Sequence, residues 1–89
     1  MGVMIRGIVV DINGQPLPNI RVLALHEPTG STFARITTAD GRYSFDNVRV
    51  GGPYALHISG DGLVSVEHKG LKLRTETVYE HDFTLQPAT

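Results

Sequence analysis

Four histidines are the side chains of this sequence best suited to hold a metal ion or to move a proton near neutral pH. They are His26, His57, His68 and His81. A zinc motif such as HExxH places two histidines one helical turn apart, and two ligands on one face of a strand would be two positions apart. No two of these histidines stand that close in the sequence. We therefore predict no metal site and no cofactor.

The surroundings of the histidines suggest ordinary structural roles. His81 alternates with Tyr79 and Phe83 along an expected strand, so we expect it to be partly buried and hydrogen-bonded. We expect His57 and His68 to lie in solvent.

Four aspartates stand where strands are expected to end, each close to a glycine or an asparagine. They are Asp11, Asp40, Asp46 and Asp61. Aspartates at such places accept hydrogen bonds from nearby backbone amides. A calcium loop would need several oxygens from a DxDxDG-like run, which this sequence lacks. Turn capping is the predicted role, rather than metal binding or acid–base catalysis.

No side chain stands in the setting of an activated nucleophile. The chain has no cysteine. Its serines lie outside any GxSxG context, in which a strand-to-helix turn exposes the nucleophile. They are Ser31, Ser44, Ser59 and Ser65. We therefore predict no catalytic residue and expect that the chain is not an enzyme.

Length and charge narrow the class of protein. The 89 residues predict one domain over residues 1–89, with a core of about residues 4–85. The formal net charge is −1, which provides no electrostatic attraction for nucleic acid or for an acidic substrate. No apolar run approaches the roughly 18 residues of a membrane span, so we expect no membrane insertion by this domain itself.

The elements that must position these residues are strands. Asp40-Gly41 is a turn signal, and Tyr43 and Phe45 then alternate with polar residues. After a Gly/Pro-containing connection, Tyr54, Leu56 and Ile58 alternate in the same way, so these five side chains are predicted to form the centre of the core. Further strands are expected at 3–11, 20–26, 33–38, 63–68 and 77–85, with a break at Lys69-Gly70 and a short extended stretch at 71–74. This spacing of strands and turns is typical of an all-β sandwich.

One set of apolar residues points the other way. If Ile5, Val9, Val22 and Ala24 face inward, then alternation turns another five apolar side chains outward. These candidates for a contact face are Met4, Ile8, Val10, Leu23 and Leu25. Single exposed apolar residues are normal, and a register slip of one residue would invert the assignment. The alternative is a contact surface for a neighbouring domain or a second copy of the chain.

Several stretches in a fixed order carry a resemblance to a known family. GIVVD from Gly7, HEPTG from His26 and ADGRYSFDNVRVGGPY from Ala39 resemble the carboxypeptidase regulatory-like domain, and the resemblance covers about Met4 to Leu85. The set, with DFTL from Asp82, is closer still to the N-terminal extension of Oar-like TonB-dependent outer-membrane receptors. The resemblance implies a seven-stranded Greek-key, prealbumin-like β-sandwich in the periplasm. This chain contains no signal peptide, so in an exported protein it would be an excised domain.

Several functions remain open at this point. The resemblance favours a non-catalytic accessory module whose partner is a neighbouring domain of a parent receptor. A carbohydrate-binding module is the first alternative, with Phe33 as the candidate aromatic platform. A stand-alone structural domain that associates with a second copy is another alternative. A small hydrolase is the least supported, because the catalytic residues are missing.

Overall fold

The computed structural model describes residues 3–74 and 78–88, and every regular element among them is a strand. The eight strands are β1 (Val3–Asp11), β2 (Arg21–His26), β3 (Ser31–Ile36), β4 (Arg42–Val48), β5 (Gly51–Ser59), β6 (Val66–Leu73), β7 (Val78–Glu80) and β8 (Phe83–Leu85). Within this described part, no helix is long and apolar enough to cross a membrane.

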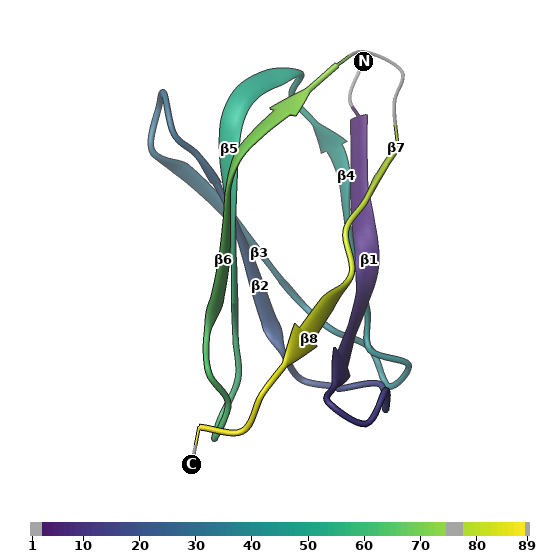
Figure 1. Ribbon diagram of the computed structural model, residues 1–89. Coiled ribbons are helices and arrows are strands. Elements are labelled where there is room, and N and C mark those ends of the chain that lie inside the picture. Colours follow the sequence, from purple (N-terminus) through teal and green to yellow (C-terminus); the bar gives the residue numbers. More distant parts are fainter. Residues whose placement is uncertain (1–2, 75–77, 89) are drawn as a thin grey trace.

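The strands form two layers that face each other (Figure 1). In the first sheet, β1 lies between β4 on one flank and the short strands β7 and β8 on the other. The second sheet has the order β3-β2-β5-β6. The prediction of an all-β sandwich is therefore confirmed.

The core lies between the layers and follows the predicted alternation. Tyr43, Phe45, Tyr54, Leu56 and Ile58 are all buried, as expected for apolar side chains at every second position of strands packed on one face. Four more predicted inward residues are also buried, which confirms the register of the first two strands: Ile5, Val9, Val22 and Ala24.

The number of strands differs from the prediction of seven. The last predicted strand, Thr77–Leu85, is two short strands in the structure, β7 and β8, and Thr77 itself lies outside the described residues. Both short strands run parallel to β1, and the backbone N–H of His81 between them donates to the carbonyl of Arg6 at 2.9 Å. The break at His81 and Asp82 depends on this distant pairing, which local alternation does not reveal.

The predicted break at Lys69-Gly70 is also wrong. β6 runs from Val66 to Leu73, and Lys69 and Gly70 form an irregularity within it, where the register against β5 shifts between Tyr54 and Leu56. Gly70 has a positive φ of 76°, which is typical of a glycine in a β-bulge. The predicted strand 33–38 begins earlier and ends at Ile36. Thr37 follows it as a buried residue, whose hydroxyl accepts from Ile20 N at 2.9 Å and donates to Leu17 O at 2.7 Å.

One side of the sandwich, which we call the closed side, lies where β6 approaches β7 and β8. The segment after β8 pairs with the loop before β6, through a bridge between Leu63 and Pro87 and a 2.8 Å bond from Val64 N to Gln86 O. On the same side, just after the end of β6, the backbone N–H of Arg74 donates to the hydroxyl of Tyr79 on β7 at 2.9 Å. The two sheets are therefore hydrogen-bonded to each other along this side.

Gly7 allows the chain to pass closely at the junction between β7 and β8. A Cβ atom at this position would lie 1.7 Å from the carbonyl oxygen of His81, which is a backbone atom and cannot swing away. The hydroxyl of Tyr43 donates to this same carbonyl at 2.7 Å. Burial and the nearby Asp82 carboxylate raise the pKa of Tyr43 well above its ordinary value, so the phenol keeps its proton and donates.

Candidate interaction site

The histidines are separated in the fold as in the sequence, with one exception. The rings of His68 and His81 lie with their centroids 4.8 Å apart across the closed side. Both are half-buried, so the expectation that His68 lies in solvent is wrong, whereas the partial burial of His81 is confirmed. Burial, and then the neighbouring His68, lower the pKa of His81, against a smaller opposite effect of Asp82.

Two aspartates accept hydrogen bonds from backbone amides. One oxygen of Asp11 accepts from Asn13 N at 2.8 Å and from Gln15 N at 2.9 Å, which confirms turn capping at this position. Asp82 accepts from the backbone N–H of Ile8 at 3.0 Å, a role that the sequence did not indicate. Over residues 3–74 and 78–88, no three His, Cys, Asp or Glu side chains converge in a way that could hold a metal ion.

The five predicted outward residues do not form one surface. All five are half-buried, and they point to the face of their strand that is opposite to the face of the buried residues. They are Met4, Ile8, Val10, Leu23 and Leu25. However, the first three are on β1 and the other two on β2, which belong to different sheets. Because outward side chains of the two sheets point to opposite sides of a sandwich, the set divides into two patches. A contact role for either patch stays a prediction.

A different region of the molecule is more exposed. β3 is the terminal strand of its sheet, and each of its six residues is exposed. It pairs with β2 residue by residue over its whole length, from Arg21–Ile36 to His26–Ser31, without a register shift. The backbone groups on its far flank have no strand beside them in the described structure. We call the side of the sandwich between β3 and β4 the open side.

Two side chains of β3 point toward the space between the sheets. Phe33 pairs with Ala24 and Arg35 pairs with Val22, and both of these partners are buried. Since paired residues in a ladder point to the same face, Phe33 and Arg35 also face inward. The Arg35 guanidinium lies 5.4 Å from the ring centroid of Phe45 on β4, so this side chain reaches across the opening.

A hollow of about 260 Å³, which we call the Phe33 hollow, lies at one end of the open side. Its lining residues are His26, Thr29, Ser31, Phe33, Asn47, Arg49 and Tyr54. The side chain of Phe33 is 45% exposed there. The Tyr54 hydroxyl donates to the Arg49 carbonyl at 2.8 Å, and a 2.7 Å bond joins His26 Nδ1 to the Thr29 hydroxyl. These bonds fix the walls of the hollow and leave the Arg49 guanidinium as its one fully charged lining group.

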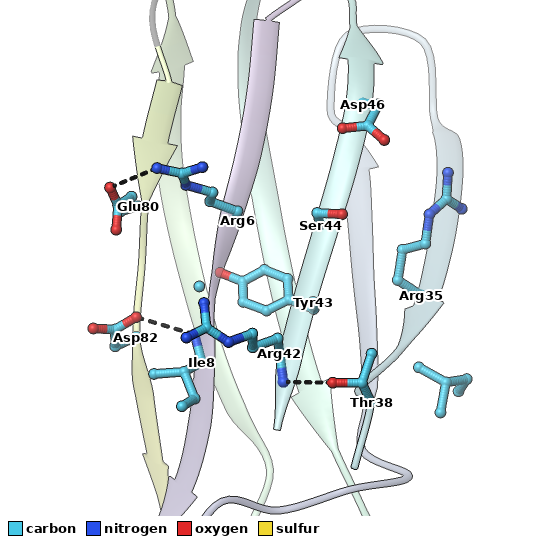
Figure 2. Close-up of a pocket in the computed structure, with 12 residues that line it drawn as sticks. Arg6, Ile8, Arg35, Thr38, Arg42, Tyr43, Ser44, Asp46, Glu80 and Asp82 are labelled. Atoms are coloured by element: carbon cyan, nitrogen blue, oxygen red, sulfur yellow. Dashed lines mark hydrogen bonds and ion pairs between the residues drawn. The ribbon is translucent and has the colours of Figure 1, made fainter. Parts of the chain in front are cut away.

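A larger hollow of about 590 Å³ lies on the outer face of the first sheet and extends to β3 (Figure 2). We call it the Arg42 hollow. Its lining contains as many arginines as carboxylates, and Arg6 forms an ion pair with Glu80 at 3.2 Å, so its charges balance. Figure 2 shows Arg35 on the β3 side of this hollow, apart from this pair.

Sequence reasoning found part of this site. Phe33 was identified as the candidate aromatic platform, and its exposure agrees with that prediction. Arg35 was missed, although its alternation with Phe33 along one strand was a usable signal. No local signal pointed to Arg49, which joins the site only because the connection after β4 brings it beside the β2–β3 hairpin.

The fold defines this protein as a small β-sandwich of two sheets. The sequence matches the family model of the carboxypeptidase regulatory-like domain over residues 4–86. The chain therefore belongs to the carboxypeptidase regulatory-like domain family. Among curated proteins, none matches its sequence.

Solved structures with a similar fold include several 1,2-dioxygenases. 3-Chlorocatechol 1,2-dioxygenase from Rhodococcus opacus has a TM-score of 0.71 at 13% identity, over 99% of this chain and 61% of the dioxygenase chain. Catechol 1,2-dioxygenase from Pseudomonas arvilla has a TM-score of 0.68 at 17% identity, with 98% and 52% covered. Hydroxyquinol 1,2-dioxygenase from Pseudomonas putida has a TM-score of 0.71 at 8% identity, with 98% and 57% covered.

These structures contradict the expectation that the chain is not an enzyme. That expectation treated a small sandwich without a catalytic constellation as a mark of non-enzymatic proteins, yet the same fold forms part of three dioxygenases. At these identities the likeness shows the fold alone. This chain also spans only between 52% and 61% of the length of these dioxygenases. The fold therefore provides no ground for excluding catalysis.

Proposed function

We propose that this chain is an interaction module that docks onto another polypeptide through its open side. The observation that carries the proposal is β3, a terminal strand whose six residues are all exposed and evenly paired on one flank only. An exposed, regular strand edge is a ready template for another chain, which natural proteins usually cover or disrupt. Membership of a family of regulatory-like domains agrees with such a role.

As the setting, we propose the periplasm, where the module would precede the plug and barrel of a TonB-dependent outer-membrane receptor. The support is the ordered set of motifs that resembles the N-terminal extension of such receptors. The same resemblance supports a Greek-key, prealbumin-like connectivity for the two sheets. The natural reading frame around this chain tests the setting: a plug and barrel after Thr89 would support it, and a stop codon there would overturn it.

Docking itself can be tested with cysteines, because the chain contains none. Thr32→Cys places a thiol on exposed β3, and Lys72→Cys places a matched control at an exposed position of β6, on the opposite edge of the sheet. Both variants are labelled with a maleimide, once in the purified chain and once in the natural protein in its cells. We expect the thiol at position 32 to be protected only in cells, and the control thiol to react in both. Equal reaction at both positions in cells would overturn the proposal.

A carbohydrate-binding module is a second candidate, because one observation favours it. Phe33 offers a partly exposed ring inside a hollow that also holds Asn47 and Arg49, which are hydrogen-bonding groups suited to sugar hydroxyls. Titration with neutral and acidic monosaccharides, followed by NMR, checks this candidate. Shifts confined to Phe33 and its neighbours would support it.

Self-association through the outward residues of β2 is a third candidate. Leu23 and Leu25 are half-buried, and the neighbouring outward residue Ile36 is 56% exposed. Sedimentation at high concentration tests this candidate, with Leu23→Lys as the variant. A strict monomer that Leu23→Lys leaves unchanged would remove it.

A further inference from the structure

We propose that the free edge of β3 binds an extended, acidic segment of polypeptide as an added strand, with carboxylate side chains at alternate positions that face Arg35 and the Phe33 hollow. This inference rests on the proposed function and names the chemistry of the partner.

The choice of β3 follows from the state of the other edges. β6 has register shifts against β5 and carries Lys69 and Lys72, and both features discourage pairing with a further strand. β7 and β8 have three residues each. β4 pairs with β1 through a register shift, and the Arg35 guanidinium lies over one of its residues, Phe45. Among the described edges, β3 is the long and regular one.

The side chains of an added strand would contact two places on the open side, Arg35 and the Phe33 hollow. Successive residues on one face of a strand are about 7 Å apart, and Phe33 and Arg35 have this relation on β3. An added strand paired with β3 has the same period, so every second side chain of it points toward the open side. One such side chain lies beside Arg35, and the next lies over the Phe33 hollow.

The charge of the open side favours carboxylates. The Phe33 hollow contains Arg49 and no carboxylate among its lining residues, and Ser31 and Asn47 add hydrogen-bond donors. Arg35 uses one nitrogen to donate to the carbonyl of Ala34 on the free flank of β3 at 2.8 Å, a bond that an added strand would replace, and its other donors are left for a ligand. Asp46 on β4 is the one carboxylate that lines the part of the opening next to Arg35. Arginine recognises carboxylates through two parallel bonds, which adds both strength and geometry.

A second copy of this chain fits less well. In a two-fold pairing of β3 with itself, the residues that face the open side of one copy would meet Ser31, Phe33 or Arg35 of the other. None of these supplies a carboxylate, since β3 contains no acidic residue. A sugar would leave the unpaired backbone edge of β3 without a partner. An acidic extended segment matches both the edge and the arginines.

The test uses short synthetic peptides and the purified chain at low ionic strength, where charge interactions are least screened. The probe alternates glutamate with valine and carries a fluorophore. One control replaces glutamate by glutamine, and a pair of controls keeps glutamate but carries N-methyl groups at odd or at even positions, which removes backbone donors from one edge. We expect saturable binding of the probe, about tenfold weaker binding of the glutamine peptide, and loss of binding for at least one methylated peptide.

Two variants locate the binding. Arg35→Gln and Arg49→Gln are expected to weaken binding of the glutamate peptide severalfold and to leave binding of the glutamine peptide unchanged. Lys72→Gln on β6 removes the same charge from the opposite edge and is expected to have no effect. Thermal melts of each variant show that it folds, and NMR shifts of the unmodified chain on adding peptide are expected along β3.

Several outcomes would overturn the inference. They are absence of binding, equal affinity for the glutamate and glutamine peptides, undiminished binding of both methylated peptides, and NMR shifts that avoid β3. A dimer through β3 that the peptide does not dissociate would replace the acidic segment by a second copy. If the peptides fail while Thr32→Cys stays protected in cells, then the proposed function holds and only the partner chemistry is wrong.

Discussion

The closed and open sides of this sandwich differ in the contacts that join the two sheets. On the closed side, the loop before β6 and the segment after β8 are joined by backbone hydrogen bonds, and two half-buried histidines pack against each other. On the open side, Thr38 after β3 is hydrogen-bonded to Arg42 at the start of β4, with a 2.9 Å bond from Thr38 N to Arg42 O, and farther along the Arg35 guanidinium lies over the Phe45 ring. The comparison teaches that both sides are tied at their ends, and that the open side differs in the long, regular and exposed flank of β3.

Gly7→Ala gives the largest expected effect, because it inserts a methyl group against a backbone carbonyl on the closed side. The added Cβ would meet the His81 carbonyl, so β7 and β8 must move away from β1. We expect a loss of about 3 kcal/mol in the free energy of unfolding, measured by urea denaturation. Gly30→Ala is the control on the β2–β3 turn, where a Cβ meets nothing and only the positive φ of 75° opposes it. An equal loss of unfolding free energy in both variants would show that the close approach at Gly7 does not contribute more to stability than the β2–β3 turn.

Tyr43→Phe is expected to come next. It removes the 2.7 Å bond to the His81 carbonyl and leaves that acceptor unpaired beside a buried ring. The expected loss is about 1–2 kcal/mol in the free energy of unfolding. Tyr54→Phe is the matched variant near the open side, since its hydroxyl bonds to the Arg49 carbonyl at 2.8 Å. A change of m-value in either variant would point to a wider rearrangement and weaken the interpretation.

Lowering the pH is expected to weaken the closed side by a smaller amount. Burial and His68 lower the pKa of His81 below its ordinary value of 6.5, so the unfolded chain binds the proton more readily. The stabilisation is therefore complete above pH 6.5 and declines as the pH falls below it. Melting temperatures between neutral and mildly acidic pH measure this decline. In His81→Gln the slope should become shallower, and an unchanged slope would assign the effect to other groups.

Phe33→Ser is expected to have the smallest effect on stability. The side chain is 45% exposed on the open side, so we expect a change of no more than about 0.5 kcal/mol. Affinity for an acidic strand or for a sugar should nevertheless fall, because both candidates use the Phe33 hollow. A large loss of stability would mean that β3 contributes to the core, and the contrast between the two sides would then disappear.

Local patterns predicted most of this fold. Alternation along Tyr54, Leu56 and Ile58 placed a strand and its buried face correctly, because a half-buried strand carries its own period of two. The split of the last strand at His81 was missed, since it depends on β1 far away in the sequence.

The candidate site was less predictable, because it too depends on contacts between residues that are distant in the sequence. Inward and outward faces were assigned correctly on β1 and β2, but the two strands belong to different sheets, so a face built from both does not exist. Phe33 was identified because an aromatic residue outside the expected core is visible in the sequence. Arg49 becomes its neighbour only through the order of the strands, which no local spacing encodes.

The pairing of β1 with β7 and β8 has a consequence for biosynthesis. Arg6 and Glu80 are 74 positions apart, and the contact between Ile8 and Asp82 spans the same separation. A ribosome therefore releases β1 long before its parallel partners exist, and folding dominated by such distant contacts is slow. During this interval the flank of β1 that later binds β7 and β8 is a second unpaired edge. The nascent chain thus offers two places for strand addition, of which completion of synthesis removes one and leaves β3.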